Sequence, residues 1–168
     1  MKKLLALNSI VLIAIFSSVY CYGRQISYSD LKDLLDILKN ASAMIFTIVG
    51  IWLAYIYPNA VTALVKPESI SLIAGKKDAK RIEMLVGIII SSAVVIVGII
   101  FFFALKLLIT PMPFYYSNIW WIKPIAITFV LMLTYIQIFS IGKVVWSNIL
   151  FINDLHNKLN KQQLEDQN

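Results

Sequence analysis

The chain has 168 residues, of which 60% are hydrophobic and only 14% are charged. Soluble globular proteins are about 45–50% apolar and about 25% charged. So few polar groups cannot cover a water-soluble surface, and the apolar residues form runs approaching the ~20 that a membrane-spanning helix needs. The composition excludes a soluble globular protein and predicts an all-α, polytopic membrane protein, with residues 1–168 forming a single membrane domain.

The net charge of +6 fits the same class, because basic residues collect in the cytoplasmic segments of membrane proteins. A nucleic-acid-binding face would interleave basic with aromatic or polar residues, whereas the aromatic residues here lie in or beside the apolar runs. We therefore expect the lipid bilayer as a partner and no contact with nucleic acid. The single cysteine, Cys21, excludes an internal disulfide.

The first apolar run, at about 4–22, follows Lys2 and Lys3. A basic start and a short hydrophobic region are also typical of a cleaved signal peptide. The residues before Gly23 make a poor cleavage site, which favours an uncleaved first span. The sequence thus predicts four transmembrane helices, or three if this segment is removed.

The segment 29–40 alternates apolar and charged residues at helical spacing. Ser29 is a candidate N-cap, and a row of leucines forms one face with charged residues opposite; the leucines are Leu31, Leu34, Leu35 and Leu38. This pattern predicts a short amphipathic helix, which packs on its own chain or on another subunit.

Three further spans are predicted at about 41–65, 84–108 and 125–145. Pro58 predicts an interfacial kink in the first of them, because proline lacks the N–H that a helix interior needs. Small residues in the next span predict close helix packing; they are Gly87, Ser91 and Gly98. A connection at 110–124, rich in proline and aromatic residues, is predicted to form an interfacial belt.

The basic residues predict the orientation. Most of them lie at the N-terminus, in the loop 66–83 and in the tail 147–168, and positive charge stays in the cytoplasm. We therefore expect a multi-pass protein of a bacterial inner (plasma) membrane with both termini cytoplasmic. The amphipathic helix 29–40 is then periplasmic.

The predicted spans have no ionisable side chain at their centres, although proton relays and many transporters need one there. Gln137 and Thr134 are the polar candidates, either for contact between helices or for lining a pore. His156 and Cys21 are too far apart in topology to form a metal set or a nucleophile–base pair. We expect no enzyme activity, no cofactor and no metal.

These features predict a homo-oligomeric interaction protein that presents a basic cytoplasmic loop and tail to a cytosolic protein partner. The candidate partner-binding residues are Lys76, Lys77, Lys80 and Arg81. In outline the chain is similar to bacteriocin immunity proteins and to membrane components of anti-phage systems, which implies a role of that kind. The alternative is a pore-forming or holin-like effector that permeabilises the membrane.

Overall fold

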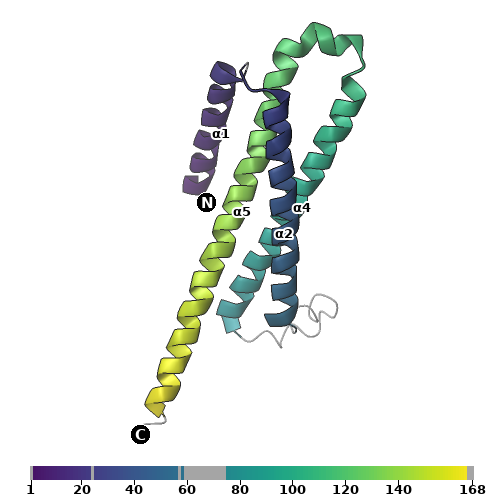
Figure 1. Ribbon diagram of the computed structural model, residues 1–168. Helices are drawn as coiled ribbons and strands as arrows, with labels where there is room; N and C mark the ends of the chain where they lie inside the picture. The colour runs from purple at the N-terminus through teal and green to yellow at the C-terminus, as the bar shows by residue number, and fades with distance from the viewer. Residues whose placement is uncertain (1, 24, 57, 59–74, 166–168) are drawn as a thin grey trace. The chain divides into compact units, whose positions relative to one another are not determined.

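The computed structural model describes residues 2–23, 25–56, 58 and 75–165, apart from the side chains of 2–8, 22, 56, 75–78, 154, 155, 158, 161 and 165. These residues form the helices α1 (Lys2–Tyr22), α2 (Tyr28–Ile56), α4 (Gly75–Ile109) and α5 (Pro113–Glu165), and no strand occurs among them (Figure 1). Three stretches are long and apolar enough to span a membrane: Tyr28–Tyr55, Ala79–Ile109 and Pro113–Asn153. The apolar part of α1 that the structure describes, Ser9–Cys21, is shorter. The fourth span therefore stays a prediction.

The predicted amphipathic helix 29–40 and the span after it form one continuous helix, α2, so the boundary expected at residue 41 does not exist. The reason is that the leucine face continues past Asn40, through the buried residues Ser42 and Val49. The N-cap is Ser27 rather than Ser29. Ser27 Oγ accepts from the Asp30 N–H at 3.1 Å and Asp30 Oδ2 accepts from the Ser27 N–H at 3.1 Å, which is a reciprocal capping arrangement.

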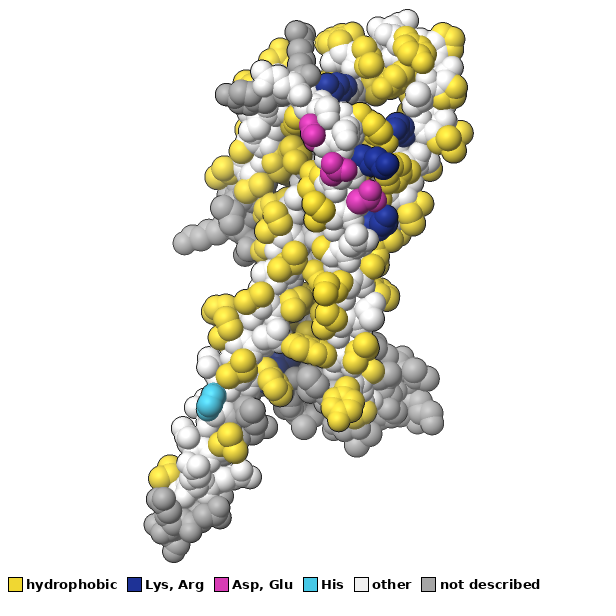
Figure 2. Space-filling model, in the orientation of Figure 1, with side chains coloured by type: hydrophobic (Ala, Val, Ile, Leu, Met, Phe, Trp, Pro, Cys, Tyr) yellow, Lys and Arg dark blue, Asp and Glu magenta, His cyan; other side chains and the backbone are white. Residues whose placement is uncertain are grey.

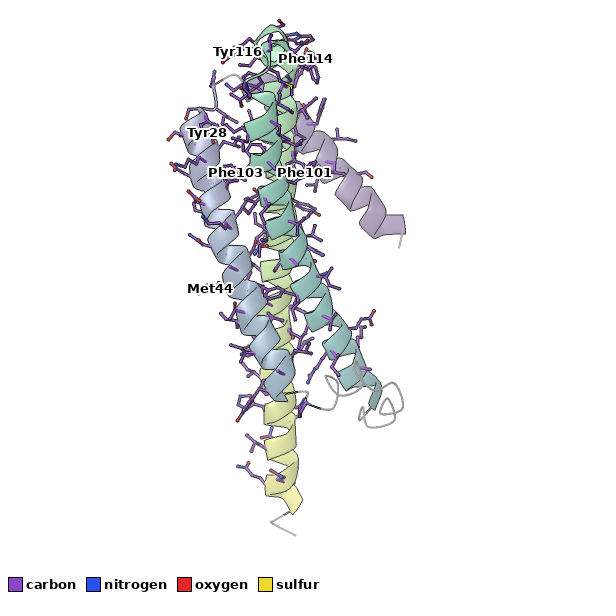
Figure 3. All side chains as sticks on the ribbon, turned by 90° about the vertical axis from the view of Figure 1, so that its right-hand side faces the viewer. Tyr28, Met44, Phe101, Phe103, Phe114 and Tyr116 are labelled. Atoms are coloured by element: carbon purple, nitrogen blue, oxygen red, sulfur yellow. The ribbon has the colours of Figure 1, made fainter. Side chains whose placement is uncertain are left out.

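Helix α5 begins at Pro113, so the connection predicted at 110–124 is only 110–112. Proline is tolerated in a first helical turn because its missing N–H would be unpaired there, and α5 also continues through Pro124. Aromatic side chains in these first turns are exposed, among them Phe114 and Tyr116 (Figure 3). Helix α4 in turn takes in 75–83 of the predicted loop 66–83, and the rest of that loop lies outside the described residues.

The chain divides into two compact units. Unit 1 consists of the described residues of Met1–Met44 and Ser91–Ile138, and unit 2 of those of Ile45–Ile90 and Phe139–Asn168. Helices α2, α4 and α5 each contribute one part to each unit.

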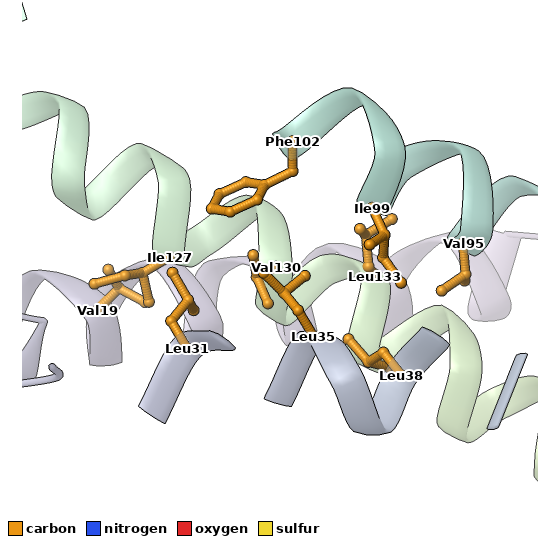
Figure 4. Packing of buried hydrophobic residues seen from close by; sticks show 10 residues of the cluster. All are labelled: Val19, Leu31, Leu35, Leu38, Val95, Ile99, Phe102, Ile127, Val130 and Leu133. Carbon is orange, nitrogen blue, oxygen red and sulfur yellow. The ribbon is translucent and has the colours of Figure 1, made fainter. Parts of the chain in front are cut away.

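The core of unit 1 is a cluster of buried apolar residues from all four helices (Figure 4). Leu35 of α2 is 0% exposed and lies at its centre, and Gly98 of α4 approaches Leu133 of α5. The buried members are Val19, Leu31, Leu35, Leu38, Val95, Ile99, Phe102, Ile127, Val130 and Leu133. These contacts pack the leucine side of α2 against α4 and α5, and the charged side chains of α2 are at least partly exposed.

The core of unit 2 is smaller. Val49 and Leu53 of α2 pack with Leu85 and Ile88 of α4, and Val144 of α5 lies against this cluster.

Candidate functional site: the polar face of helix α2

Helix α2 carries a band of polar and small side chains on the side away from the core. The residues that define this polar face are Ser29, Asp33, Asp36, Asn40 and Ala43, all at least partly exposed. They recur at alternating spacings of four and three residues, which keeps them on one side of the helix. Figure 2 shows the acidic side chains and neighbouring lysines gathered over α2, among mostly hydrophobic side chains.

One ion pair lies on the polar face. Lys39 Nζ is 2.8 Å from Asp36 Oδ1, and the two side chains are 55% and 47% exposed. At the start of the helix, Lys106 Nζ of α4 lies 3.2 Å from the centroid of the Tyr28 ring, a cation–π contact.

Contacts within unit 1 show which residues of α4 and α5 lie beside the polar face, that is, at the same level along the helix axes. Tyr28 is level with Lys106 of α4, and Ser42 is level with Gln137 of α5 because their side chains share a hydrogen bond. Lys39 lies between these two levels on α2. Leu38, the residue before it, belongs to the same cluster as Val95 of α4.

This level is the middle of the longest uncharged stretch of α4. Residues 84–105 of α4 carry no ionisable side chain. The stretch is about 33 Å long at the α-helical rise, close to the hydrocarbon thickness of a bilayer. Val95 lies midway along it, and the facing stretch of α5, 124–142, is likewise uncharged. The charged side chains of α2 therefore lie beside the uncharged stretches of α4 and α5, which are the parts best suited to lipid.

The outward side of α4 differs sharply from the polar face of α2. Its exposed side chains at similar levels are apolar, including Val94, Val97 and Phe101. Such a surface suits lipid. The polar face of α2 thus differs from the exposed apolar surface of α4 in the same part of unit 1.

Gln137 and Thr134, the candidate pore or interhelix residues, lie inside unit 1 rather than on its surface. Gln137 is 2% exposed, and its Oε1 accepts a hydrogen bond from Ser42 Oγ at 2.9 Å. Thr134 Oγ1 donates to the Val130 carbonyl of its own helix at 2.9 Å. Gln137 Nε2 and the buried Ser92 Oγ have no hydrogen-bond partner. The geometry therefore assigns Gln137 to helix packing.

A double-mutant cycle on Ser42→Ala and Gln137→Leu tests this packing contact. We expect a coupling of about 0.6 kcal/mol in the free energy of unfolding, the average for hydrogen bonds between membrane helices. The measurement is an unfolding titration with denaturing detergent in mixed micelles. Thr134→Ala is the control, since its hydrogen bond stays within α5, and it should not couple to Ser42→Ala. Fully additive effects of Ser42→Ala and Gln137→Leu would contradict the contact.

The three predicted packing residues of α4 lie in different surroundings. A Cβ added at Gly98 would lie 2.7 Å from Leu133 Cδ2, whereas one added at Gly87 would meet nothing within 4 Å. Ser91 is partly exposed. The close approach of α4 to α5 is therefore at Gly98, and Gly87 makes no such approach.

The basic residues of the predicted loop occupy the first turns of α4. The side chains of Lys76 and Lys77 lie outside the described residues, and Lys80 is exposed. Arg81 is partly buried, and its Nη2 donates to the Leu150 carbonyl of α5 at 3.1 Å. Arg81 therefore joins two helices of unit 2.

Pro58, the predicted kink, is exposed, and α2 ends at Ile56 before it. Its neighbours in sequence, residues 57 and 59, lie outside the described residues. The kink thus stays a prediction.

Sequence reasoning did not show which parts of α4 and α5 the segment 29–40 lies beside. It predicted a helix outside the membrane because five charged residues fall in that segment, and that position stays a prediction. The available signal was the leucine face, which runs in register into the span after it: Leu38 and Ser42 are one turn apart and both are buried. In the described part of the chain, no group of three or more His, Cys, Asp and Glu side chains is arranged to hold a metal ion.

Comparison with known proteins provides no relative from which a function can be transferred. No protein-family model, no curated protein and no solved structure matches the chain.

Proposed function

We propose that this protein is the subunit of a homo-oligomer in a bacterial inner membrane, and that it presents its basic segment and the end of α5 to a cytosolic protein. The observation that carries the proposal is the level of the polar face of α2, beside the uncharged stretches of α4 and α5.

Lipid is a poor environment for this face. If residues 84–105 of α4 cross the hydrocarbon, Asp33, Asp36 and Lys39 lie within it. A charged side chain at the bilayer centre costs about 2.5–3.5 kcal/mol on insertion scales. Since Asp33 and Lys39 are exposed on this subunit, another protein surface or water must surround them. Further copies of the same chain are the simplest source of that surface.

Moving the bilayer along unit 1 does not resolve the conflict between the charges of α2 and the apolar stretch of α4. Bringing Lys39 into the headgroup region would carry 95–105 of α4 out of the hydrocarbon. That segment contains exposed apolar side chains such as Val97 and Phe101. The apolar length of α4 therefore supports the placement that buries the polar face at depth.

The cytoplasmic side is assigned by charge. Basic residues are concentrated near the N-terminus, in 66–83 and after Val145, which favours the cytoplasm for these segments. Helix α5 extends from Val145 to Glu165, about 30 Å at the helical rise. Ile149, Ile152 and Leu159 are exposed along it and form an apolar stripe for a partner. The outline similarity to immunity and anti-phage proteins makes a toxin or defence protein the first partner to test.

The oligomer is tested by the mass of the purified protein. Light scattering in mild detergent should give a multiple of the 19.1 kDa chain that does not change on dilution. Amine crosslinking in native membranes should give the same multiple. A triple variant with leucine at Asp33, Asp36 and Lys39 replaces the charged side chains by ones that lipid can surround. It should shift the protein toward monomer. The control Val97→Leu should leave the oligomer unchanged. A wild-type monomer in both experiments would refute the proposal.

A further inference from the structure

We infer that unit 1 contains a buried binding site for one water molecule, held between Gln137 Nε2 of α5 and Ser92 Oγ of α4. The site lies in the interior of a single chain, so it goes beyond the proposed function and does not depend on the oligomer. It is also separate from the polar face of α2, whose side chains are at least partly exposed.

The core of unit 1 ends in one apolar residue from each of α2, α4 and α5. Figure 4 shows these residues, Leu38, Val95 and Leu133, near one another at the end of the cluster that lies away from Val19. Gly98, one turn from Val95, approaches Leu133 closely, so α4 and α5 are in direct contact here. Inward-facing positions recur every three or four residues along a helix. The next inward-facing residue of each helix therefore lies just beyond this end of the core.

The next inward-facing residue is polar in all three helices. Ser42 and Gln137 lie one turn after the α2 and α5 members of that apolar group, and Ser92 lies one turn before the α4 member. All three lie beyond the same end because α4 runs opposite to α2 and α5 in the cluster. Ser42 and Ser92 are 0% exposed and Gln137 is 2% exposed. Three helices thus bring buried polar side chains to one level of unit 1.

Two atoms of this polar group have no hydrogen-bond partner. Gln137 Oε1 accepts from Ser42 Oγ at 2.9 Å, but Gln137 Nε2 has no acceptor for its N–H groups. Ser92 Oγ has no partner either, so these two atoms do not bond to each other directly. A buried polar atom without a partner is costly, and lipid around the helices offers none. A molecule that bonds to both atoms removes the cost at each.

The chemistry of the two atoms selects a neutral molecule that both donates and accepts. Gln137 Nε2 only donates, so it repels a cation. The described buried residues of unit 1 include no charged side chain, so neither a cation nor an anion has a counter-charge there. Water suits both atoms, because it accepts from Gln137 Nε2 and donates to Ser92 Oγ, and two polar partners are within the usual range for a buried water. The bridge extends the Ser42–Gln137 hydrogen bond to α4.

A crystal structure of the protein grown from a lipidic mesophase tests the site directly. We expect an ordered water about 2.7–3.2 Å from both Gln137 Nε2 and Ser92 Oγ. Ser92→Ala removes one partner without adding bulk, so the peak for this water should be lost. Thr134→Val is the matched control, because Thr134 Oγ1 donates within its own helix, and the peak should remain. A wild-type structure without this water, with Ser92 Oγ bonded to a carbonyl of α4 or directly to Gln137, would overturn the inference.

Thermal unfolding in detergent provides a second measurement. Either Ser92→Ala or Gln137→Leu alone leaves the opposite side of the bridge without its partner. The loss of melting temperature in the double variant should therefore be smaller than the sum of the two single losses. Ser92→Ala combined with Thr134→Val should be additive. Additive losses for Ser92→Ala and Gln137→Leu would contradict the bridge, whereas a monomer by light scattering would contradict only the proposed function.

Discussion

Leu35→Asp is expected to prevent the chain from accumulating as a folded membrane protein, whereas Asn40→Asp, on the same helix, is expected to be tolerated. Leu35 is 0% exposed and lies among side chains of α4 and α5. A carboxylate there has no water and no partner, so it loses at least the ~2.5–3.5 kcal/mol of a charge at depth, with the packing of the leucine lost in addition. Asn40 lies on the polar face, where two carboxylates are already present.

The measurement is the amount of protein in the membrane fraction together with its thermal unfolding in detergent. Leu35→Ala serves as a milder companion, because it leaves a cavity without a charge and should lower the melting temperature without abolishing folding. If Asn40→Asp were as damaging as Leu35→Asp, the polar face would be facing lipid, and the argument from its depth would fail.

Gly98→Leu is expected to destabilise the packing of α4 against α5, and Gly87→Leu in the same helix is not. At Gly98 even the first added carbon would lie 2.7 Å from Leu133 Cδ2 and 3.0 Å from Leu133 Cδ1. A full leucine there must separate the helices or displace Leu133, at the cost of overpacking, about 1–3 kcal/mol. At Gly87 an added carbon meets nothing within 4 Å.

The two glycine variants make a matched pair because both replace glycine by leucine in one apolar helix. The free energy of unfolding in a detergent titration separates them. A second change, Leu133→Ala, should restore part of the stability of Gly98→Leu because it vacates the space that the new side chain needs. Equal loss at Gly87 and Gly98, or no rescue by Leu133→Ala, would show that the close approach is absent.

The proposed oligomer adds positions at which functional variants should be sought. For the oligomer these positions lie on α2, at Asp33, Asp36 and Asn40. In the basic segment, Arg81 bonds to Leu150, whereas Lys80 is exposed. Variants of the end of α5 remain the test for a cytosolic partner, since that segment is long and exposed.

The sequence by itself determined the class of the protein. Its long uncharged runs predicted an all-helical membrane protein, and the described helices α2, α4 and α5 are long and apolar enough to span a membrane. Composition suffices for this because the cost of placing backbone and side chains in lipid depends on local residue type, which is read directly from each run. The close packing at Gly98 also had a local signal, the small residue itself.

Only the tertiary structure decided what the segment 29–40 lies beside. Its charges predicted a surface helix, because sequence patterns count charges without knowing which level of the neighbouring helices they face. The hydrogen bond between Ser42 and Gln137 and the contact of Lys106 with Tyr28 set that level. Both contacts join residues far apart in the chain, so local periodicity could not supply them. The neighbours of a charged side chain are a property of packing, and here packing places the charges of α2 beside the uncharged stretches of α4 and α5.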